Sequence, residues 1–332
     1  MNGDIARLLH DSAERLVSRL APVPATDAAW AERLPELDAA IAEAGLPLAL
    51  VPEAQGGLGL GWAEVAVLPR LWGRRAVPRP IIEPLLAARI VHACGLDPQW
   101  LGASVAAEAD GRIDAAWWPG TTGLLVVDQA GVRGFSAVVP NGADLTGQPR
   151  ACPAGTAPAV AAGMAGTAEL LAGARLLTVA AMLGAMEQAR DLALDYARVR
   201  TQFGKPLGQF QAVQRLLTQA ASEVEAVRAM LAAALDALDA SDCPEWLAAG
   251  TKARAGQAAT VVATHAHQVL GAIGFTEEHE LHRSTRRLWC WRDDWGREAA
   301  CAEAVGIAVA QAGGDGLWPL LTDRHRERKD IA

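Results

Sequence analysis

Apolar residues recur every three or four positions over most of the chain, and this period predicts helices. The pattern begins between Gly3 and Leu20. It resumes over 28–44, 62–74 and 81–93, with Asp27 as the expected N-cap of the second stretch. We therefore expect a helical unit in residues 1–104.

The pattern changes in the middle of the chain. Short apolar runs over 113–118, 123–128 and 131–139 are each bounded by Gly, Pro or Asp. Such runs predict strands. Residues 105–165 are therefore expected to form a small β-domain.

Long amphipathic stretches follow, in residues 166–332. One helix is expected from Thr167 to a stop at Phe203–Gly204. An apolar stripe from Phe210 to Leu238 predicts a second helix, and the others are expected over 246–270 and 277–312. Short connections between such helices predict an antiparallel four-helix bundle.

Composition narrows the classes of partner. The net charge of -8 and the lack of a basic patch argue against nucleic acid. The N-terminus does not resemble a signal peptide, and no uninterrupted apolar run reaches the length of a membrane span. The 5 Cys are scattered without metal spacing, which favours reduced thiols in a cytoplasmic protein. We expect no metal site, because His279, Glu280 and His282 lack a known ligand spacing.

The most informative segment is the turn between the first two bundle helices, Tyr196–Gln214. Gly204 and Gly208 permit a tight turn, and Pro206 cannot continue a helix. Arg200 stands before a new helix N-terminus, an arrangement that suits a phosphate-bearing ligand. By spacing alone, an ordinary helix hairpin explains the same residues.

Three motifs together resemble the acyl-CoA dehydrogenase family. The turn is similar to the family's Y-A-x-x-R-x-Q-F-G-x-P pattern, Val51–Leu60 resembles its P-E-x-x-G-G-L-G, and His267–Thr276 resembles its Q-x-x-G-G-x-G-[FY]. The resemblance implies a mainly α fold with an N-terminal helical domain, a middle β-domain that is truncated here, and a C-terminal four-helix bundle.

The resemblance also implies a reaction. Family members remove the α-proton of an acyl-CoA thioester with a glutamate, and FAD accepts the β-hydride. Ala272 stands where the family usually has a second Gly. Its methyl group leaves less room for the cofactor at one of the two implied FAD contacts. The implied FAD-binding residues are Arg200, Phe203, Gly204 and Gln211 at the first contact, and Gln268, Gly271 and Gly274 at the second, toward a neighbouring cofactor.

The catalytic base is where the chain departs from the family pattern. Trp295 occupies the position of the glutamate in one branch, and Ala174, before Arg175, occupies it in the other. Asp294 is a weak candidate for a displaced base, although a solvated pair with Asp293 is the simpler interpretation. The loop and strand with which the family holds the flavin ring are also missing.

Retained FAD motifs without a base suggest a subunit of a hetero-oligomer. The chain is similar to the short subunits of heterotetrameric acyl-CoA dehydrogenases of bacterial steroid degradation, in which a homologous subunit supplies the base. The implied partners are that subunit, acyl-CoA and electron-transfer flavoprotein, although the sequence itself does not identify the electron acceptor. Two alternatives remain open: a homomeric dehydrogenase that uses Asp294, and a flavin-free scaffold of the same fold.

Overall fold

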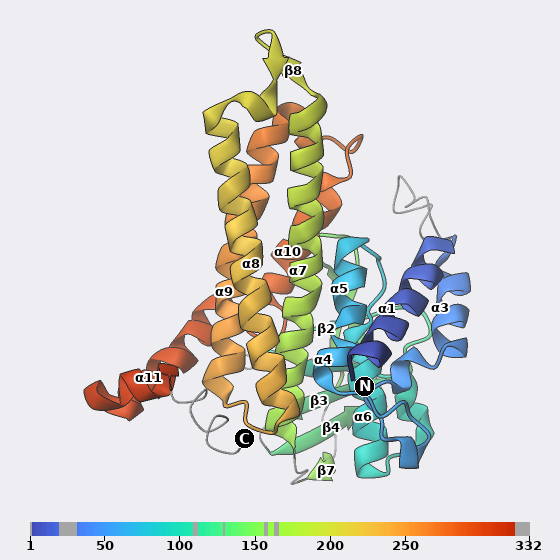
Figure 1. Ribbon diagram of the computed structural model, residues 1–332. Helices are drawn as coiled ribbons and strands as arrows, with labels where there is room; N and C mark the ends of the chain where they lie inside the picture. The colour runs from blue at the N-terminus through green and yellow to red at the C-terminus, as the bar shows by residue number, and fades with distance from the viewer. Residues whose placement is uncertain are drawn as a thin grey trace.

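The computed structural model has three parts, shown in Figure 1: an N-terminal helical unit, a β-domain at the base and a long helical bundle. The structure describes residues 2–19, 32–108, 112–128, 130–155, 159–162 and 166–322. The predicted order of helices, strands and bundle is confirmed.

The helices of the N-terminal unit are short. The helix predicted over 28–44 is described from Leu34 onward, and its predicted cap, Asp27, lies outside the described residues. Gly95, at φ 60, ends the last helix of the unit in the left-handed conformation that glycine tolerates. The described helices are α1 (Asn2–Arg19), α3 (Leu34–Glu43), α4 (Trp62–Val65), α5 (Val67–Arg74) and α6 (Ile82–Cys94).

The β-domain contains two small sheets. The first has the order β1-β3-β4-β7 and the second the order β2-β6-β5. β1 pairs in parallel with β3, and the other pairs are antiparallel. The described strands are β1 (Ser104–Ala107), β2 (Ala115–Ala116), β3 (Leu124–Asp128), β4 (Gly131–Phe135), β5 (Val138–Ala143), β6 (Pro149–Pro153) and β7 (Ala159–Ala162).

The prediction of one strand over 131–139 is wrong. The chain leaves the first sheet after Phe135 and enters the second at Val138, so the single apolar run serves two sheets. β1, β6 and β7 were not predicted, because their segments are rich in Ala and Pro, which disfavour strands in isolation.

The bundle consists of α7 (Thr167–Val199), α8 (Gln211–Asp239), α9 (Glu245–Leu270) and α10 (Leu281–Asp293). A small hairpin, β8 (Thr201–Gln202) and β9 (Lys205–Pro206), projects from the end where α7 stops (Figure 1). Among the described helices, α7 alone is long and apolar enough to span a membrane, but 83% of its most apolar window is buried inside the protein. Such burial is typical of the central helix of a bundle.

The N-terminal unit contacts the bundle through closely apposed backbones. A Cβ on Gly73 of α5 would lie 1.9 Å from the carbonyl oxygen of Ala181, and one on Gly184 of α7 would lie 1.9 Å from that of Arg70. Both positions therefore require glycine, because any side chain would collide with the other helix.

The prediction of one helix over 277–312 is wrong. The chain breaks between α10 and α11 (Glu298–Thr322), where Trp295 has φ 57 and Gly296 has φ 122. A non-glycine residue in this region is strained, so contacts elsewhere must hold the turn. α11 then leaves the bundle as an arm (Figure 1), and it is mostly exposed although it is largely apolar.

Candidate functional site

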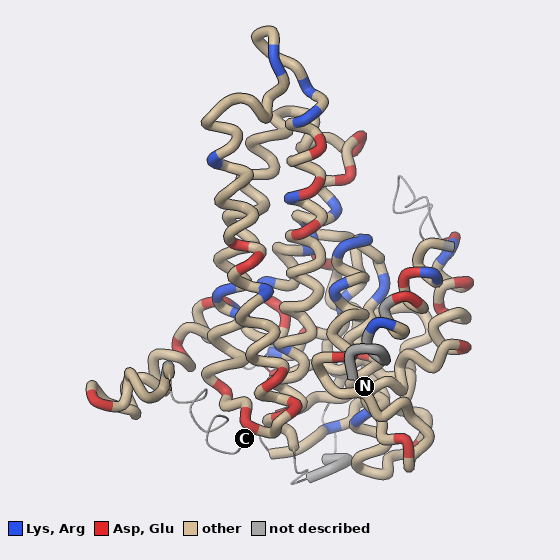
Figure 2. The backbone as a smooth tube through the Cα atoms, viewed as in Figure 1, with Lys and Arg blue, Asp and Glu red and all other residues tan. Residues whose placement is uncertain are grey.

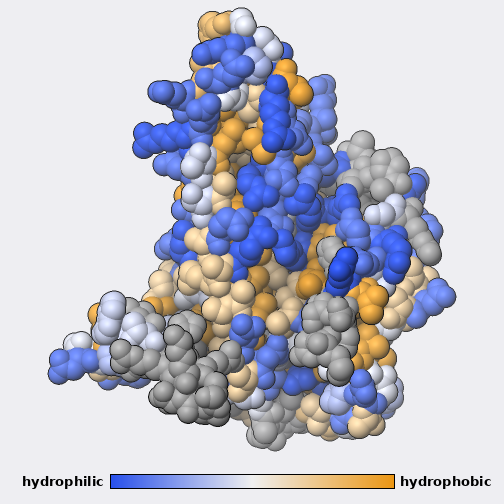
Figure 3. Space-filling view, viewed as in Figure 1, coloured by the Kyte–Doolittle hydropathy of each residue, from blue (hydrophilic) through white to orange (hydrophobic). Residues whose placement is uncertain are grey.

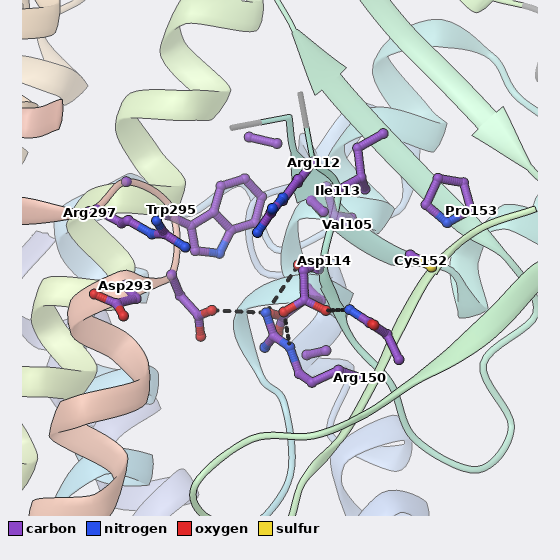
Figure 4. Close-up of a pocket in the computed structure, with 17 residues that line it drawn as sticks. Val105, Arg112, Ile113, Asp114, Arg150, Cys152, Pro153, Asp293, Trp295 and Arg297 are labelled. Atoms are coloured by element: carbon purple, nitrogen blue, oxygen red, sulfur yellow. Dashed lines mark hydrogen bonds and ion pairs between the residues drawn. The ribbon is translucent and has the colours of Figure 1, made fainter. Parts of the chain in front are cut away.

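A cleft of about 950 Å³ lies where the three parts of the fold meet. Its walls are the first turn of α6, strands β1, β2, β5 and β6 of the β-domain, and the turn between α10 and α11. In Figure 4, charged side chains from both sides of the cleft project into this space. A concave space between domains is the usual place for a ligand site.

The two positions predicted for the family base lie close together, and one of them, Trp295, lines the cleft. Arg175, the residue after Ala174, donates a hydrogen bond from its Nε to the backbone oxygen of Trp295 at 3.1 Å. The fold therefore brings the two positions to one place although they are far apart in the sequence. Neither position carries a carboxylate.

Asp294 does not behave as a solvated acid. Its carboxylate accepts a hydrogen bond from Arg150 of β6 at 3.0 Å, which joins the β-domain to the bundle. Burial raises the pKa of Asp294 above its ordinary value, although the charges of Arg150 and Lys252 oppose the rise. Its neighbour Asp293 also lines the cleft and is exposed.

Arg150 is the central cation of the cleft. Its Nε donates to Asp114 at 2.9 Å, so one guanidinium lies between two carboxylates (Figure 4). Burial alone would lower the pKa of Arg150, but the attraction of Asp294 and Asp114 raises it above its ordinary value. Asn141 donates a further hydrogen bond to Asp114 at 3.0 Å. Asp294 is therefore ion-paired with Arg150 in this cluster.

Glu83 is the residue that the sequence analysis missed. It lies in the first turn of α6 and lines both the cleft and a smaller cavity beside it. Burial raises the pKa of Glu83 from 4.5 to about 7, with a smaller contribution from the negative charge of Asp294. Its own backbone N–H and Arg150 oppose the rise. A lone Glu after an apolar helix start gives no signal in the sequence, because its environment comes from distant segments.

Lys252 supports the turn that borders the cleft. Its Nζ is buried in α9 and donates to the carbonyl oxygens of Arg292 at 2.8 Å and Gly296 at 3.2 Å. These bonds cap the C-terminus of α10, where carbonyl groups lack helical partners. Burial lowers the pKa of Lys252 to about 8. The strained conformation at Trp295 is thus held by a cation inside the bundle.

The predicted FAD-binding residues lie at the opposite end of the bundle. Arg200 follows the last residue of α7, and Phe203 and Gly204 form the tip of the hairpin with φ 49 and 79. Phe203 is 91% exposed and meets Phe210 edge to face at 6.2 Å. Gln211 is the exposed first residue of α8. Figure 2 shows basic residues on this hairpin.

The second predicted group lies at the same end, because α9 runs in the same direction as α7. Gln268 is exposed in the last turn of α9, and Gly271 follows it at φ 65 with open space where a Cβ would be. Gly274 differs from these two. It is buried, and a Cβ there would lie 3.0 Å from Leu270 and 3.3 Å from His267, so packing explains this glycine.

The hairpin end and the cleft are far apart. Arg175 borders the cleft and Arg200 the hairpin, and the 25 helical residues between them span roughly 38 Å. The structure thus brings together Arg200, Phe203, Gly204, Gln211, Gln268 and Gly271 at one end, and Asp294, Arg150 and Glu83 at the other.

Known proteins are similar to this chain over part or most of its length. Residues 161–292 match the family model of the acyl-CoA dehydrogenase C-terminal domain. Acyl-CoA dehydrogenase IpdE2 from Mycobacterium tuberculosis is 28% identical over 257 residues, which cover 74% of this chain and 77% of that protein. Other curated relatives are 34–38% identical over 113–126 residues, so the chain spans only 27–32% of their length.

Solved structures share the fold over nearly the whole chain. One, a variant of the Tcur3481–Tcur3483 steroid ACAD, has a TM-score of 0.78 at 22% identity and covers 94% of this chain and 99% of its own. The ChsE4-ChsE5 complex from Mycobacterium tuberculosis has a TM-score of 0.76 at 21% identity, covering 92% and 97%.

Proposed function

Because the chain has the acyl-CoA dehydrogenase fold and carries the C-terminal domain of that family, we propose that it is one subunit of a hetero-oligomeric, FAD-dependent acyl-CoA dehydrogenase. In this proposal its hairpin end completes the FAD site of a homologous partner subunit. The partner supplies the family glutamate, and electron-transfer flavoprotein takes up the electrons. The names of two structural neighbours, Tcur3481–Tcur3483 and the ChsE4-ChsE5 complex, each combine two proteins, and this supports a hetero-oligomer over a homomer.

One observation carries the proposal: the residues with FAD motifs are exposed and far from this chain's own cleft. Phe203 is 91% exposed, and roughly 38 Å of helix separates Arg200 from the cleft. In the space-filling view, hydrophobic and hydrophilic residues lie side by side at this protruding end (Figure 3). A cofactor held there has to extend into another chain.

The residues at the hairpin end fit the phosphate half of a dinucleotide. α8 begins beside Arg200 without a side-chain cap, so its first N–H groups are available to an anion. Arg200 makes no ion pair among the described residues. Its guanidinium can therefore form bidentate hydrogen bonds with a phosphate group. Bound FAD would supply the hydride acceptor, while these residues would only bind and orient it.

The exposed arm supports the existence of a partner. α11 is apolar around its circumference, and such a helix is normally buried. Yet Ile307 is 51% exposed and Trp318 is 72% exposed. A second chain against α11 would remove this surface from water.

The test is FAD retention in the complex of this chain with its homologous partner. We expect Arg200→Gln or Phe203→Ala to weaken FAD binding about tenfold or more, because a charge-assisted hydrogen bond or a large aromatic contact is lost. Arg198→Gln is the matched control, since Arg198 is an exposed arginine near the same helix end and pairs only with Asp195 in the described structure. Full FAD occupancy in both hairpin variants would contradict the proposal.

The two alternatives give different outcomes in the same experiment. A homomeric dehydrogenase that uses Asp294 would turn over acyl-CoA without a partner, and Asp294→Asn would abolish that activity. The pairing of Asp294 with Arg150 disfavours this role, because a carboxylate held by a guanidinium is not free to approach a substrate. A flavin-free scaffold would show no flavin absorbance in any complex.

A further inference from the structure

Glu83 is a carboxyl group that faces the cleft without a cation of its own. Within the described part of the chain, its side chain makes no ion pair, and its carboxylate accepts a hydrogen bond only from its own backbone N–H. It lies in the first turn of α6, where the helix dipole tolerates a negative charge. It is therefore neither part of a salt bridge nor a cap of a neighbouring helix.

The charges around the cleft favour the protonated form of Glu83. Arg150 pairs with Asp114 and Asp294, so two of the three carboxyl groups near this guanidinium contact it and Glu83 does not. Like charges in one site do not all ionise together, and the group without direct contact to the cation keeps the proton most easily. The charged groups around this cluster come from every part of the fold that borders it. They are Arg112, Asp114, Asp144 and Arg150 of the β-domain, Lys252, Arg287, Asp293, Asp294 and Arg297 of the bundle and the turn after it, and Arg79 of the N-terminal unit.

We propose that Glu83 is the proton-transferring residue of this chain's own cleft. Its carboxylate takes the α-proton of an acyl thioester bound there, and the electron pair of the C–H bond moves into the thioester carbonyl. In the reverse step the carboxylic acid returns the proton to the α-carbon. The inference deepens the proposed function, since it takes an acyl thioester as the ligand of the cleft.

Glu83 suits this role better than Asp294 does. Asp294 is held by Arg150 at 3.0 Å, and a proton acceptor has to be free to approach the substrate. Glu83 lines the same 950 Å³ space and carries one more methylene group, so its carboxyl reaches farther from its backbone. A group that changes protonation near neutral pH also exchanges protons most efficiently.

The test is exchange of the α-hydrogens of acyl-CoA thioesters for deuterium in D2O, measured by mass spectrometry on the full chain. Exchange needs no hydride acceptor, so it proceeds with or without FAD and separates this inference from the proposed function. Propionyl-CoA and octanoyl-CoA are the probes. The wild-type rate should rise with pH and level off above about pH 7.

We expect Glu83→Gln to slow exchange at least about 100-fold, the usual contribution of a general base. The matched first-turn variant Glu36→Gln, which lies on α3 outside the cleft, should keep most of the rate. Glu83→Asp, which retains the carboxyl but shortens it, should give an intermediate rate and serves as the second variant if Glu83→Gln does not fold.

Two results would overturn the inference. One is exchange in Glu83→Gln at the wild-type rate, and the other is the absence of exchange above buffer in the wild-type chain with both probes. FAD retention by the hairpin end is unaffected by either result, because it is measured in the complex and depends on residues at the other end of the bundle.

Discussion

The raised pKa of the half-buried Glu83 leads to a prediction about stability that needs no substrate. In Glu83→Gln the neutral amide replaces a group whose pKa rises from 4.5 to about 7 on folding. Below pH 4.5 both the folded and the unfolded chain hold the proton. Between pH 4.5 and 7 the unfolded chain releases it while the folded chain keeps it, so the wild-type free energy of unfolding falls as pH rises.

The size of the effect follows from the pKa values. A rise from 4.5 to about 7 corresponds to about 3 kcal/mol at 1.36 kcal/mol per unit. Glu83 is half-buried, and water screening lowers the expected gain to about 2 kcal/mol. Glu83→Gln should therefore match the wild type near pH 4 and exceed its stability by about 2 kcal/mol at pH 8.

Urea unfolding followed by tryptophan fluorescence at a series of pH values measures this difference, provided that the slope m stays constant between variants. Glu36→Gln serves as the control, because Glu36 is an exposed first-turn glutamate outside the cleft. If the difference between Glu83→Gln and the wild type is the same at pH 4 and pH 8, the carboxyl does not titrate as the structure requires.

Three further predictions follow from the packing and the ion pairs. Arg150→Met should destabilise the fold by about 3 kcal/mol at pH 7, because Asp114 and Asp294 lose their shared cation. The loss should be smaller at pH 4, because the raised pKa of Asp294 favours its neutral form there; urea unfolding at both pH values checks this. Gly184→Ala should cost about 3 kcal/mol or more in the free energy of unfolding, since its Cβ would meet a carbonyl oxygen at 1.9 Å, whereas Gly306→Ala on exposed α11 should change it by less than about 0.5 kcal/mol. Phe203→Ala should leave the melting temperature of the isolated chain unchanged, because the ring is 91% exposed; a clear drop would mean that the hairpin supports the fold.

The sequence determined the helical architecture and the location of the hairpin. The stripe from Phe210 to Leu238 predicts the helix that the structure begins at Gln211 and ends at Asp239, because a 3.6-residue period survives in any bundle. The sequence also predicted a turn that contains Arg200, Phe203 and Gly204, because Gly and Pro interrupt helices locally.

Tertiary structure alone decided the break at Trp295 and the environment of Glu83. Trp295 adopts φ 57 because Arg175 and Lys252 hold the turn around it, and neither is its neighbour in the sequence. Glu83 acquires its high pKa because segments far away in the sequence bury it, and the negative charge of Asp294 adds a smaller contribution. Periodicity and turn chemistry are local properties, whereas desolvation and charge sharing depend on which distant segments the fold brings together.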